Sequence, residues 1–180
     1  MGLWQGGTGI CCLPGSHMKT IRVGEDGRIT AFRTSLTGEM IFALSQDTIL
    51  KHAVELDAPM DPAYLLMGYD HCERLGLSQT LFKVRLLDTQ LHASRAGIYS
   101  FFLGAVLWED VSRLIADAPA KVVIGGKRQL REAMALLLQS RSRIEVIGVT
   151  EALVAASTAL GAVRIYEYGK NQREESPKNK

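Results

Sequence analysis

The segment "LPGSHMK", residues 13–19, joins an apolar run, "ICCL", to a strand-like run, "TIRV". A turn needs Pro or Gly to set its dihedral angles, but it needs neither a His nor a Lys. A turn between two strands can direct several backbone N–H groups at one point, where an anion binds. Gly15 would allow close approach, Ser16 would donate a hydroxyl, and Lys19 would add positive charge. The simpler interpretation is a plain hairpin turn with an incidental His17 and Lys19, and the segment alone leaves both open.

A second candidate is "VVIGGKRQL", in which Gly125 and Gly126 separate an apolar strand pattern from a helix pattern. Glycines at the carboxyl end of a parallel strand mark the place where open α/β sheets bind nucleotides. The segment is neither a GxxxxGK[ST] loop nor a GxGxxG fingerprint. An ordinary tight turn between strand and helix is the alternative.

A third candidate is "RTSLTGE", where Thr34, Ser35 and Thr37 precede a helix pattern. Helix capping by Thr37, with Glu39 in the first turn, accounts for the segment without any ligand. The histidines lack HxH or HxxxH spacing, and the three cysteines form no CxxC pair. We therefore expect no metal site.

The elements that must position these residues follow from hydrophobic periodicity. Residues 11–36 alternate as three strands, and Asp26-Gly27 predicts a type I′ hairpin turn between the last two. A helix pattern runs from Thr37 to Leu50, and residues 53–96 mix helix and loop. The stretch "AGIYSFFLGAVLWEDVSRLIADAP" predicts a long apolar helix, in which Gly104 indicates close packing.

The remainder alternates between strand and helix patterns. "KVVIGG" and "IEVIGV" predict buried strands, "RQLREAMALLLQS" and "TEALVAASTALGA" predict helices, and "VRIYEYG" predicts a short last strand. Three consecutive strands followed by strand–helix–strand–helix indicate an α/β fold with an antiparallel and a parallel part.

Composition limits the class of protein. The chain has 180 residues, 47% of them hydrophobic and 22% charged, with a net charge of +2. These values are ordinary for one globular domain. The sequence shows no basic stripe with interleaved aromatic residues, the pattern that would predict nucleic-acid binding. No run approaches the roughly 20 apolar residues of a membrane span, and no signal peptide is visible. We expect a cytoplasmic protein with no nucleic-acid or membrane partner.

The order of these motifs resembles the 2-dehydro-3-deoxygalactonokinase family, sugar-acid kinases of the actin, hexokinase and heat-shock-ATPase superfamily. Members carry a segment like LPGTHSKW, a short DG hairpin, and F-x-T-x-(M/L)-T-G-E followed by F-A-L-L and S-I-L. This chain has "LPGSHMKTIRVGEDGRITAFRTSLTGEMIFALSQDTIL". Later, "LFKVRLL" is similar to L-F-x-x-R-x-L, and "YSFFLGAVLWEDV" to Y-L-S-G-L-L-I-G-x-E, so the resemblance covers about residues 10–165. Ser16, Met18 and Thr20 depart from the family's Thr, Ser and Trp.

The resemblance implies a ribonuclease-H-like, actin-like ATPase domain, with an antiparallel meander and parallel strands in one mixed sheet flanked by helices. It implies that the full enzyme moves the γ-phosphoryl of ATP, with Mg²⁺, to the sugar acid 2-dehydro-3-deoxy-D-galactonate, giving the 6-phosphate in galactonate catabolism. It assigns no catalytic carboxylate, neither Glu39 nor Asp26. The residues implied are Gly15, Ser16, His17 and Lys19 for phosphate, Gly125 and Gly126 for the nucleotide, and, by motif matching only, Thr37 and Arg85.

The resemblance implies a full-length protein of two similar domains that close over ATP and sugar. The first of these domains brings a D-x-G-T hairpin, which this sequence lacks. We therefore interpret residues 10–169 as the second, nucleotide-side domain, after a lead-in at 1–9 and before a disordered tail at 170–180. A truncated gene, a split gene or an expressed fragment would each explain this. An exposed half-site and the apolar start around Trp4 predict a homodimer or association with the missing first domain. The alternatives are a non-catalytic remnant that binds nucleotide or a protein, and another sugar kinase of the superfamily.

Overall fold

A computed structural model describes residues 7–175 of the chain. It divides into two compact units, Met1–Gly148 and Val149–Lys180. The elements of the first unit are β1 (Gly9–Leu13), β2 (Met18–Val23), β3 (Ile29–Ser35), α1 (Thr37–Gln46), α2 (Pro62–Leu75), α3 (Leu77–Thr89), α4 (Arg95–Ala116), β4 (Lys121–Ile124), α5 (Arg128–Arg141) and β5 (Glu145–Gly148). The second unit contains α6 (Glu151–Glu175).

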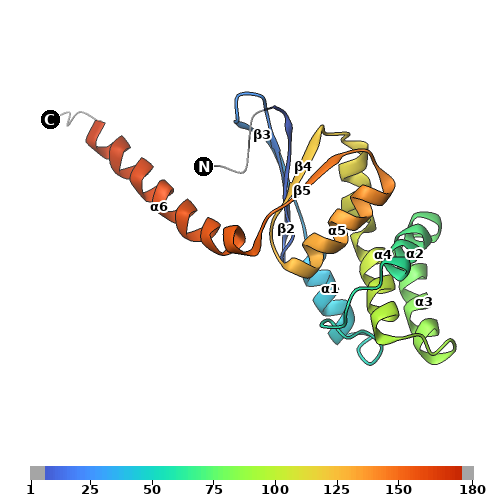
Figure 1. Ribbon diagram of the computed structural model, residues 1–180. Coiled ribbons are helices and arrows are strands. Elements are labelled where there is room, and N and C mark those ends of the chain that lie inside the picture. The colour runs from blue at the N-terminus through green and yellow to red at the C-terminus, as the bar shows by residue number, and fades with distance from the viewer. Residues whose placement is uncertain (1–6, 176–180) are drawn as a thin grey trace. The chain divides into compact units, whose positions relative to one another are not determined.

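The first unit is built on one five-stranded mixed sheet with the order β3-β2-β1-β4-β5 (Figure 1). The three amino-terminal strands pair antiparallel as a meander, and β1, β4 and β5 pair parallel. The expected fold class is confirmed, because the antiparallel and the parallel parts share one sheet. The parallel pairing brings the carboxyl ends of β1 and β4 to the same edge.

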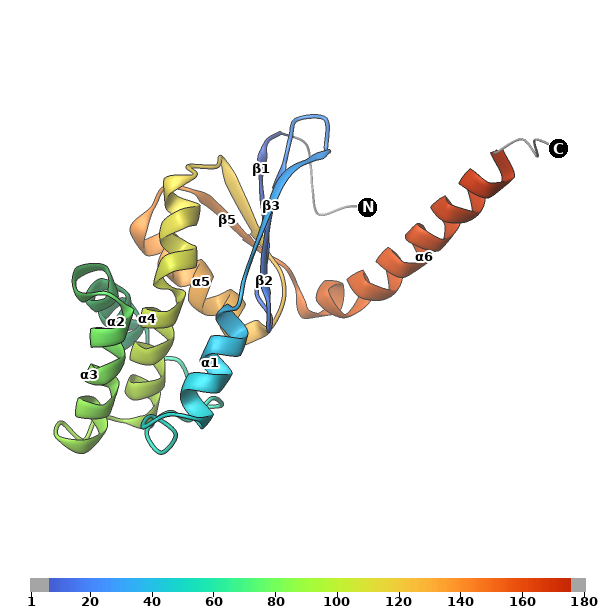
Figure 2. The ribbon, with the colours of Figure 1, turned by 180° about the vertical axis from the view of Figure 1, so that it is seen from behind.

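All five helices of this unit lie on one side of the sheet, as two opposite views show (Figure 2). Alternate residues of the strands point toward these helices. Together with side chains of α4 and α5 they form a continuous core. The strand residues that contribute to it are Ile10, Cys12, Met18, Val122 and Ile124.

Helices α2 and α4 pack through glycines at their contact. A Cβ atom on Gly104 would stand 2.0 Å from the carbonyl oxygen of Leu65, and one on Gly68 would stand 2.0 Å from that of Phe101. Each helix therefore presents a bare backbone to the other. The close packing predicted from Gly104 is confirmed.

The hairpin between β2 and β3 differs from the predicted type I′ turn. Only Gly27 has a positive φ, 76°, whereas a type I′ turn needs two such residues and Asp26 is not one of them. The amide of Gly27 donates to the carbonyl of Gly24 at 3.0 Å, and the amide of Gly24 donates to that of Arg28 at 2.9 Å. The loop is thus one residue longer than predicted, and its left-handed position falls on Gly27 alone.

The predicted last strand, "VRIYEYG", is wrong, because α6 runs continuously from Glu151 to Glu175 through that segment. The helix therefore extends into the stretch at 170–180 that we expected to be a tail, and residues 176–180 lie outside the described part. Trp4 and most of the lead-in also lie outside it. No helix in the described range is long and apolar enough to cross a bilayer.

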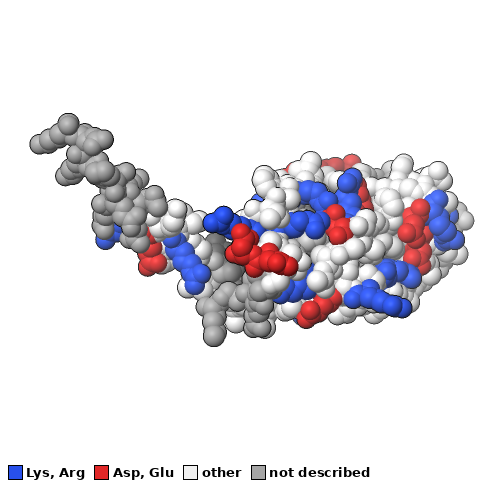
Figure 3. Space-filling view, turned by 90° about the horizontal axis from the view of Figure 1, so that it is seen from above, with Lys and Arg blue, Asp and Glu red and all other residues white. Residues whose placement is uncertain are grey.

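Acidic and basic side chains are intermixed on the face of the molecule that Figure 3 shows. Among the described residues, several opposite charges form ion pairs, such as Arg113 with Glu109 at 2.9 Å and Arg141 with Asp70 at 2.6 Å. All four of these side chains are at least one-third exposed, so each pair contributes little to stability.

Candidate functional site

The turn between β1 and β2 is held against the loop that follows β4. The amide of Gly125 donates to the carbonyl of Cys12 at 2.9 Å, which continues the parallel ladder past the end of β4. The amide of Lys127 donates to the carbonyl of Pro14 at 3.1 Å. Gly126, between them, has a φ of +73°, and a Cβ there would stand 2.0 Å from the carbonyl oxygen of Pro14. The first two motifs of the sequence therefore form one backbone assembly.

The start of α1 packs against the same turn from another direction. A Cβ atom on Gly38 would stand 2.0 Å from the carbonyl oxygen of Gly15. The amide of Glu39 donates to the carbonyl of Ser16 at 3.0 Å. Three motifs that are far apart in the sequence thus converge at the carboxyl ends of β1 and β4.

Three amides of the turn itself remain available. Within the described part of the chain, the N–H groups of Gly15, Ser16 and His17 donate to no other protein group. A buried turn would not leave three adjacent donors without acceptors, but this one is at least partly exposed. These N–H groups are free to bind water or an anion.

A cavity of about 590 Å³ opens beside this assembly. Its wall combines backbone and polar groups of the three motifs with apolar side chains from α1, α4, α5 and the loop after α1. The wall is formed by Gly15, Ser16, Gly38, Glu39, Ile41, Phe42, Ala43, Leu56, Tyr99, Lys127, Gln129 and Leu130. This volume and mixed lining are typical of a site for a small organic ligand with one polar end.

His17 lies next to the cavity and pairs with Glu39, with 2.6 Å between Nε2 and Oε1. Both side chains are about half exposed, so the pair is a weak source of stability. It does fix the orientation of the only carboxylate that lines the cavity.

Thr37 does not cap α1 as predicted, because Leu36 occupies the N-cap position and makes no side-chain cap. Thr37 is instead the first helical residue, 4% exposed, and its hydroxyl donates to the Asp110 carboxylate on α4. Ser35 donates to the other oxygen of Asp110 at 2.9 Å. This network ties the end of β3 and the start of α1 to α4, so Thr37 holds Gly38 and Glu39 in place without lining the cavity.

Sequence reasoning missed Asp110. The usable signal was a carboxylate that ends the apolar run of α4, at the acidic end of the segment "YSFFLGAVLWED". What no sequence pattern provides is its partner, because Asp110 and Thr37 are 73 residues apart.

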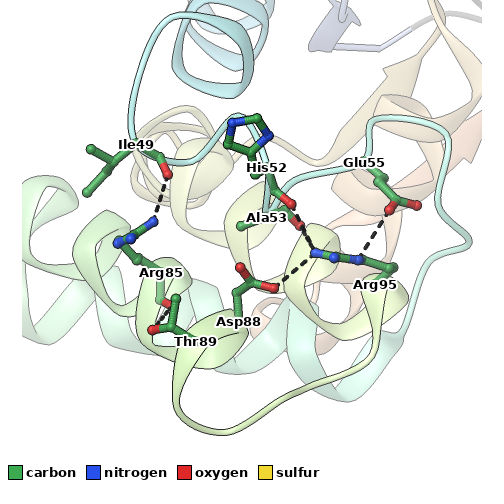
Figure 4. Close-up of polar contacts among 8 residues, drawn as sticks. All are labelled: Ile49, His52, Ala53, Glu55, Arg85, Asp88, Thr89 and Arg95. Carbon is green, nitrogen blue, oxygen red and sulfur yellow. Dashed lines mark hydrogen bonds and ion pairs between the residues drawn. The ribbon is translucent and has the colours of Figure 1, made fainter.

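Arg85 lies away from the cavity, on α3 (Figure 4). Its guanidinium donates to the carbonyl of Ile49 at 3.3 Å, beside the contacts of Arg95 with the same loop. Arg85 therefore supports the loop after α1, and the structure does not bring it to the site.

Lys19 is also absent from the cavity wall. It follows Met18, which points into the core, so its side chain lies on the opposite face of the sheet. The lysine that does line the cavity is Lys127, which follows Gly125-Gly126 directly and which sequence reasoning passed over.

The thiols near the turn are not poised for chemistry. Burial raises the pKa of Cys12 to about 12, and the nearby negative charge of Asp110 adds to this effect. Burial also raises the pKa of Cys11. Both remain neutral at physiological pH, so neither acts as a nucleophile. No group of three or more His, Cys, Asp or Glu side chains in residues 7–175 is arranged to hold a metal ion.

Comparison with known protein families decides the family. The model of the 2-keto-3-deoxy-galactonokinase family matches residues 1–160. This chain is a member of that family. The resemblance inferred from the sequence motifs is confirmed. A curated 2-dehydro-3-deoxygalactonokinase family protein of Rhizobium meliloti (strain 1021), DgoK1, is 42% identical over 48 residues, which are 27% of this chain and 15% of the relative.

Solved structures agree on the fold. A Sinorhizobium meliloti protein assigned to 2-dehydro-3-deoxygalactonokinase superposes with a TM-score of 0.74 at 23% identity, over 91% of this chain of the 2-keto-3-deoxy-galactonokinase family and 56% of the other chain. The activator of 2-hydroxyisocaproyl-CoA dehydratase from Clostridium difficile, solved with bound ADPNP, has a TM-score of 0.50 at 13% identity, over 98% of this chain and 65% of the other. The chain thus spans little more than half of the solved family structure.

Proposed function

We propose that this chain is the nucleotide-binding part of a kinase that transfers the γ-phosphoryl group of ATP to the terminal hydroxyl of 2-keto-3-deoxy-galactonate. The observation that carries the proposal is the convergence of the β1–β2 turn, the start of α1 and the loop after β4 at one 590 Å³ cavity. Family membership supports the reaction class. The bound ADPNP of the activator with a similar fold supports a nucleotide as the ligand.

The cavity offers two kinds of surface to a nucleotide. The free amides of Gly15, Ser16 and His17 and the Ser16 hydroxyl would hold phosphate oxygens, because converging N–H donors bind anions. Apolar side chains such as Phe42, Leu56 and Tyr99 would contact the nucleoside. Gly125 and Gly126 would act by holding the turn, since neither belongs to the cavity wall.

Mg²⁺ fits this site only together with the nucleotide. Glu39 is the one carboxylate of the cavity wall, and it is already paired with His17. Mg²⁺ commonly takes most of its ligands from substrate phosphates and water. When bound, the ion would neutralise phosphate charge during transfer, while this chain's own residues bind and orient the phosphates.

A complete kinase would need more than the surface described here. The relatives with solved structures are longer than the span they share with this chain. A non-catalytic nucleotide-binding or protein-interaction role is the second candidate, and another sugar kinase of the same superfamily is the third. We keep a cytoplasmic location as part of the proposal, because all three cysteines are free thiols.

Association with a second copy or with a further domain is also part of the proposal. On the edge strand β3, Ile29 is 66% exposed and Phe32 is 76% exposed. Exposed apolar residues on an unpaired edge favour pairing with another chain. Light scattering at high concentration should show a dimer, and a strict monomer without a partner would contradict the homodimer.

The test of the nucleotide site is calorimetric titration of the 180-residue chain with Mg·ADP. We expect binding by the wild type and its loss in Gly15→Val. The nearest atom to a Cβ at Gly15 is the carbonyl oxygen of His17 at 3.8 Å, so the fold accepts a side chain that then occupies the anion position. Circular dichroism and thermal melting would verify that the variant is folded. No binding by the wild type, or equal binding by both proteins, would overturn the proposal.

A further inference from the structure

The wall of the candidate site carries one positive charge, that of Lys127, without a negatively charged protein partner among the described residues. Two side chains that are charged at neutral pH line the described cavity, Glu39 and Lys127. Glu39 is paired with His17 at 2.6 Å, whereas the Lys127 side chain has no ion pair or hydrogen bond within the described residues. The cavity therefore contains one lysine whose charge no protein group compensates.

The backbone of Lys127 is held firmly although its ammonium group is free. Its amide donates to the carbonyl of Pro14, and its own carbonyl accepts from the amide of Arg131 at 2.9 Å. Its dihedral angles, φ −61° and ψ 134°, place it at the N-cap of α5. The stem of the side chain thus starts from a fixed point next to the β1–β2 turn.

Local helix energetics do not explain this lysine. The first turn of α5 contains no acidic residue, and Arg128 follows Lys127 directly. Positive charge at a helix N-terminus opposes the helix dipole, and lysine cannot accept a hydrogen bond from the free amides there as a capping residue does. A cation at this position is unfavourable for the helix itself, which makes an anionic ligand the better explanation.

We propose that Lys127 is the phosphate-binding lysine of this cavity, with its ammonium paired to the outer phosphate of a bound nucleoside diphosphate or triphosphate. This inference rests on the proposed function. It replaces the role that the sequence suggested for Lys19, whose side chain lies on the opposite sheet face. The turn amides and Lys127 would then hold the phosphates from two sides, and Lys127 would discriminate nucleotides by the number of phosphates.

The experiment compares Lys127→Met with Lys51→Met, which removes an exposed lysine of the loop after α1 that is not part of the cavity wall. Both variants are titrated with Mg·ADP and with adenosine. Lys127→Met should weaken Mg·ADP binding tenfold or more, as loss of a charge-assisted hydrogen bond implies, and leave adenosine binding unchanged. Lys127→Arg should restore most of the affinity. Lys51→Met should change neither titration.

A further variant, Lys19→Met, separates the two lysines. The inference requires Lys19→Met to change Mg·ADP affinity less than threefold. Unchanged Mg·ADP binding by Lys127→Met, or a larger loss in Lys19→Met, would overturn the assignment of Lys127 while the nucleotide site stands. An equal loss of affinity for adenosine and for Mg·ADP would also overturn the assignment. Such a loss would indicate a packing defect, which weakens binding whether or not the ligand carries phosphates. Absence of Mg·ADP binding by the wild type would instead overturn the proposed function, and this inference with it.

Discussion

Gly38 and Gly15 touch backbone to backbone, with space for no side chain on Gly38. A Cβ added there would stand 2.0 Å from the carbonyl oxygen of Gly15 and 2.7 Å from the Cα of Ser16. Backbone atoms of a hydrogen-bonded turn cannot move aside as the end of a flexible side chain can. The glycine of the "TGE" motif is thus required for the helix to meet the turn.

Gly38→Ala should therefore destabilise the fold by about 1–3 kcal/mol, as overpacking does, and should disrupt the cavity beside it. Urea denaturation measures the first effect, and titration with Mg·ADP measures the second. Gly148→Ala is the matched control, because no atom lies within 4 Å of a Cβ at that position. Equal stability of both variants would show that the turn yields more easily than its geometry indicates.

Asp110→Ala should lower the free energy of unfolding by about 1–3 kcal/mol, because it leaves the hydroxyls of Ser35 and Thr37 without their shared acceptor. Glu109→Ala removes the neighbouring carboxylate, whose pair with Arg113 is exposed, and should cost at most about 0.5 kcal/mol. Denaturant titration of both variants checks the difference. Similar losses of unfolding free energy in the two variants would mean that the hydrogen bonds of Asp110 do not contribute to stability.

Arg95 is predicted to anchor the loop after α1 more strongly than Arg85 does. Its guanidinium contacts Glu55 at 3.2 Å, Asp88 at 3.0 Å and the carbonyl of Ala53 at 3.2 Å (Figure 4). Arg95→Met should thus destabilise the protein by about 1–2 kcal/mol, a value reduced by the partial exposure of this side chain. Limited proteolysis should cut the loop after α1 faster in Arg95→Met than in the wild type.

Arg85→Met is the comparison for that variant, because Arg85 reaches the loop through the single carbonyl of Ile49. It should cost less than about 1 kcal/mol and leave Mg·ADP binding unchanged. A loss of nucleotide affinity in Arg85→Met would restore the direct role that motif matching suggested.

Stability should fall as the pH rises above about 9, partly because of Cys12. Burial raises the pKa of this thiol from 9.0 to about 12, so the folded state keeps a proton that the unfolded state loses in this interval. The unfolded state then binds fewer protons, and the free energy of unfolding decreases with pH. Denaturation of the wild type and Cys12→Ala between pH 8 and 10.5 measures this, and the variant should show the shallower decline. Parallel curves would contradict it.

Kinase turnover by the 180-residue chain alone should stay at background. The chain spans 56% of the solved family structure, and enzymes commonly close loops or domains over their substrates to complete the catalytic site. A coupled assay of ADP release with Mg·ATP and 2-keto-3-deoxy-galactonate measures this directly. Robust turnover would show that the chain carries all the necessary groups.

Local signals determined most of the secondary structure. The alternation of residues 18–35 predicted the antiparallel meander, and the glycines after "VVI" predicted the strand-to-helix loop. Such signals act through neighbours in the chain, so one sequence suffices to find them. The failure at "VRIYEYG" has a local cause as well. A helix begins at Glu151, the sequence has no proline from Glu151 up to residue 177, and elongation of a helix costs less than starting a new element.

The membership of the site was decided by tertiary structure. Sequence placed Gly15 and Ser16 at the site, and both line the cavity. It chose Lys19 where the structure brings Lys127, because the face to which a strand side chain points depends on which face the helices cover. The contact of Asp110 with Thr37 likewise depends on how α4 lies across the start of α1. The positions of glycines and turns can be predicted from neighbouring residues in the sequence. The partners of a charged side chain, in contrast, are determined only when distant segments pack together.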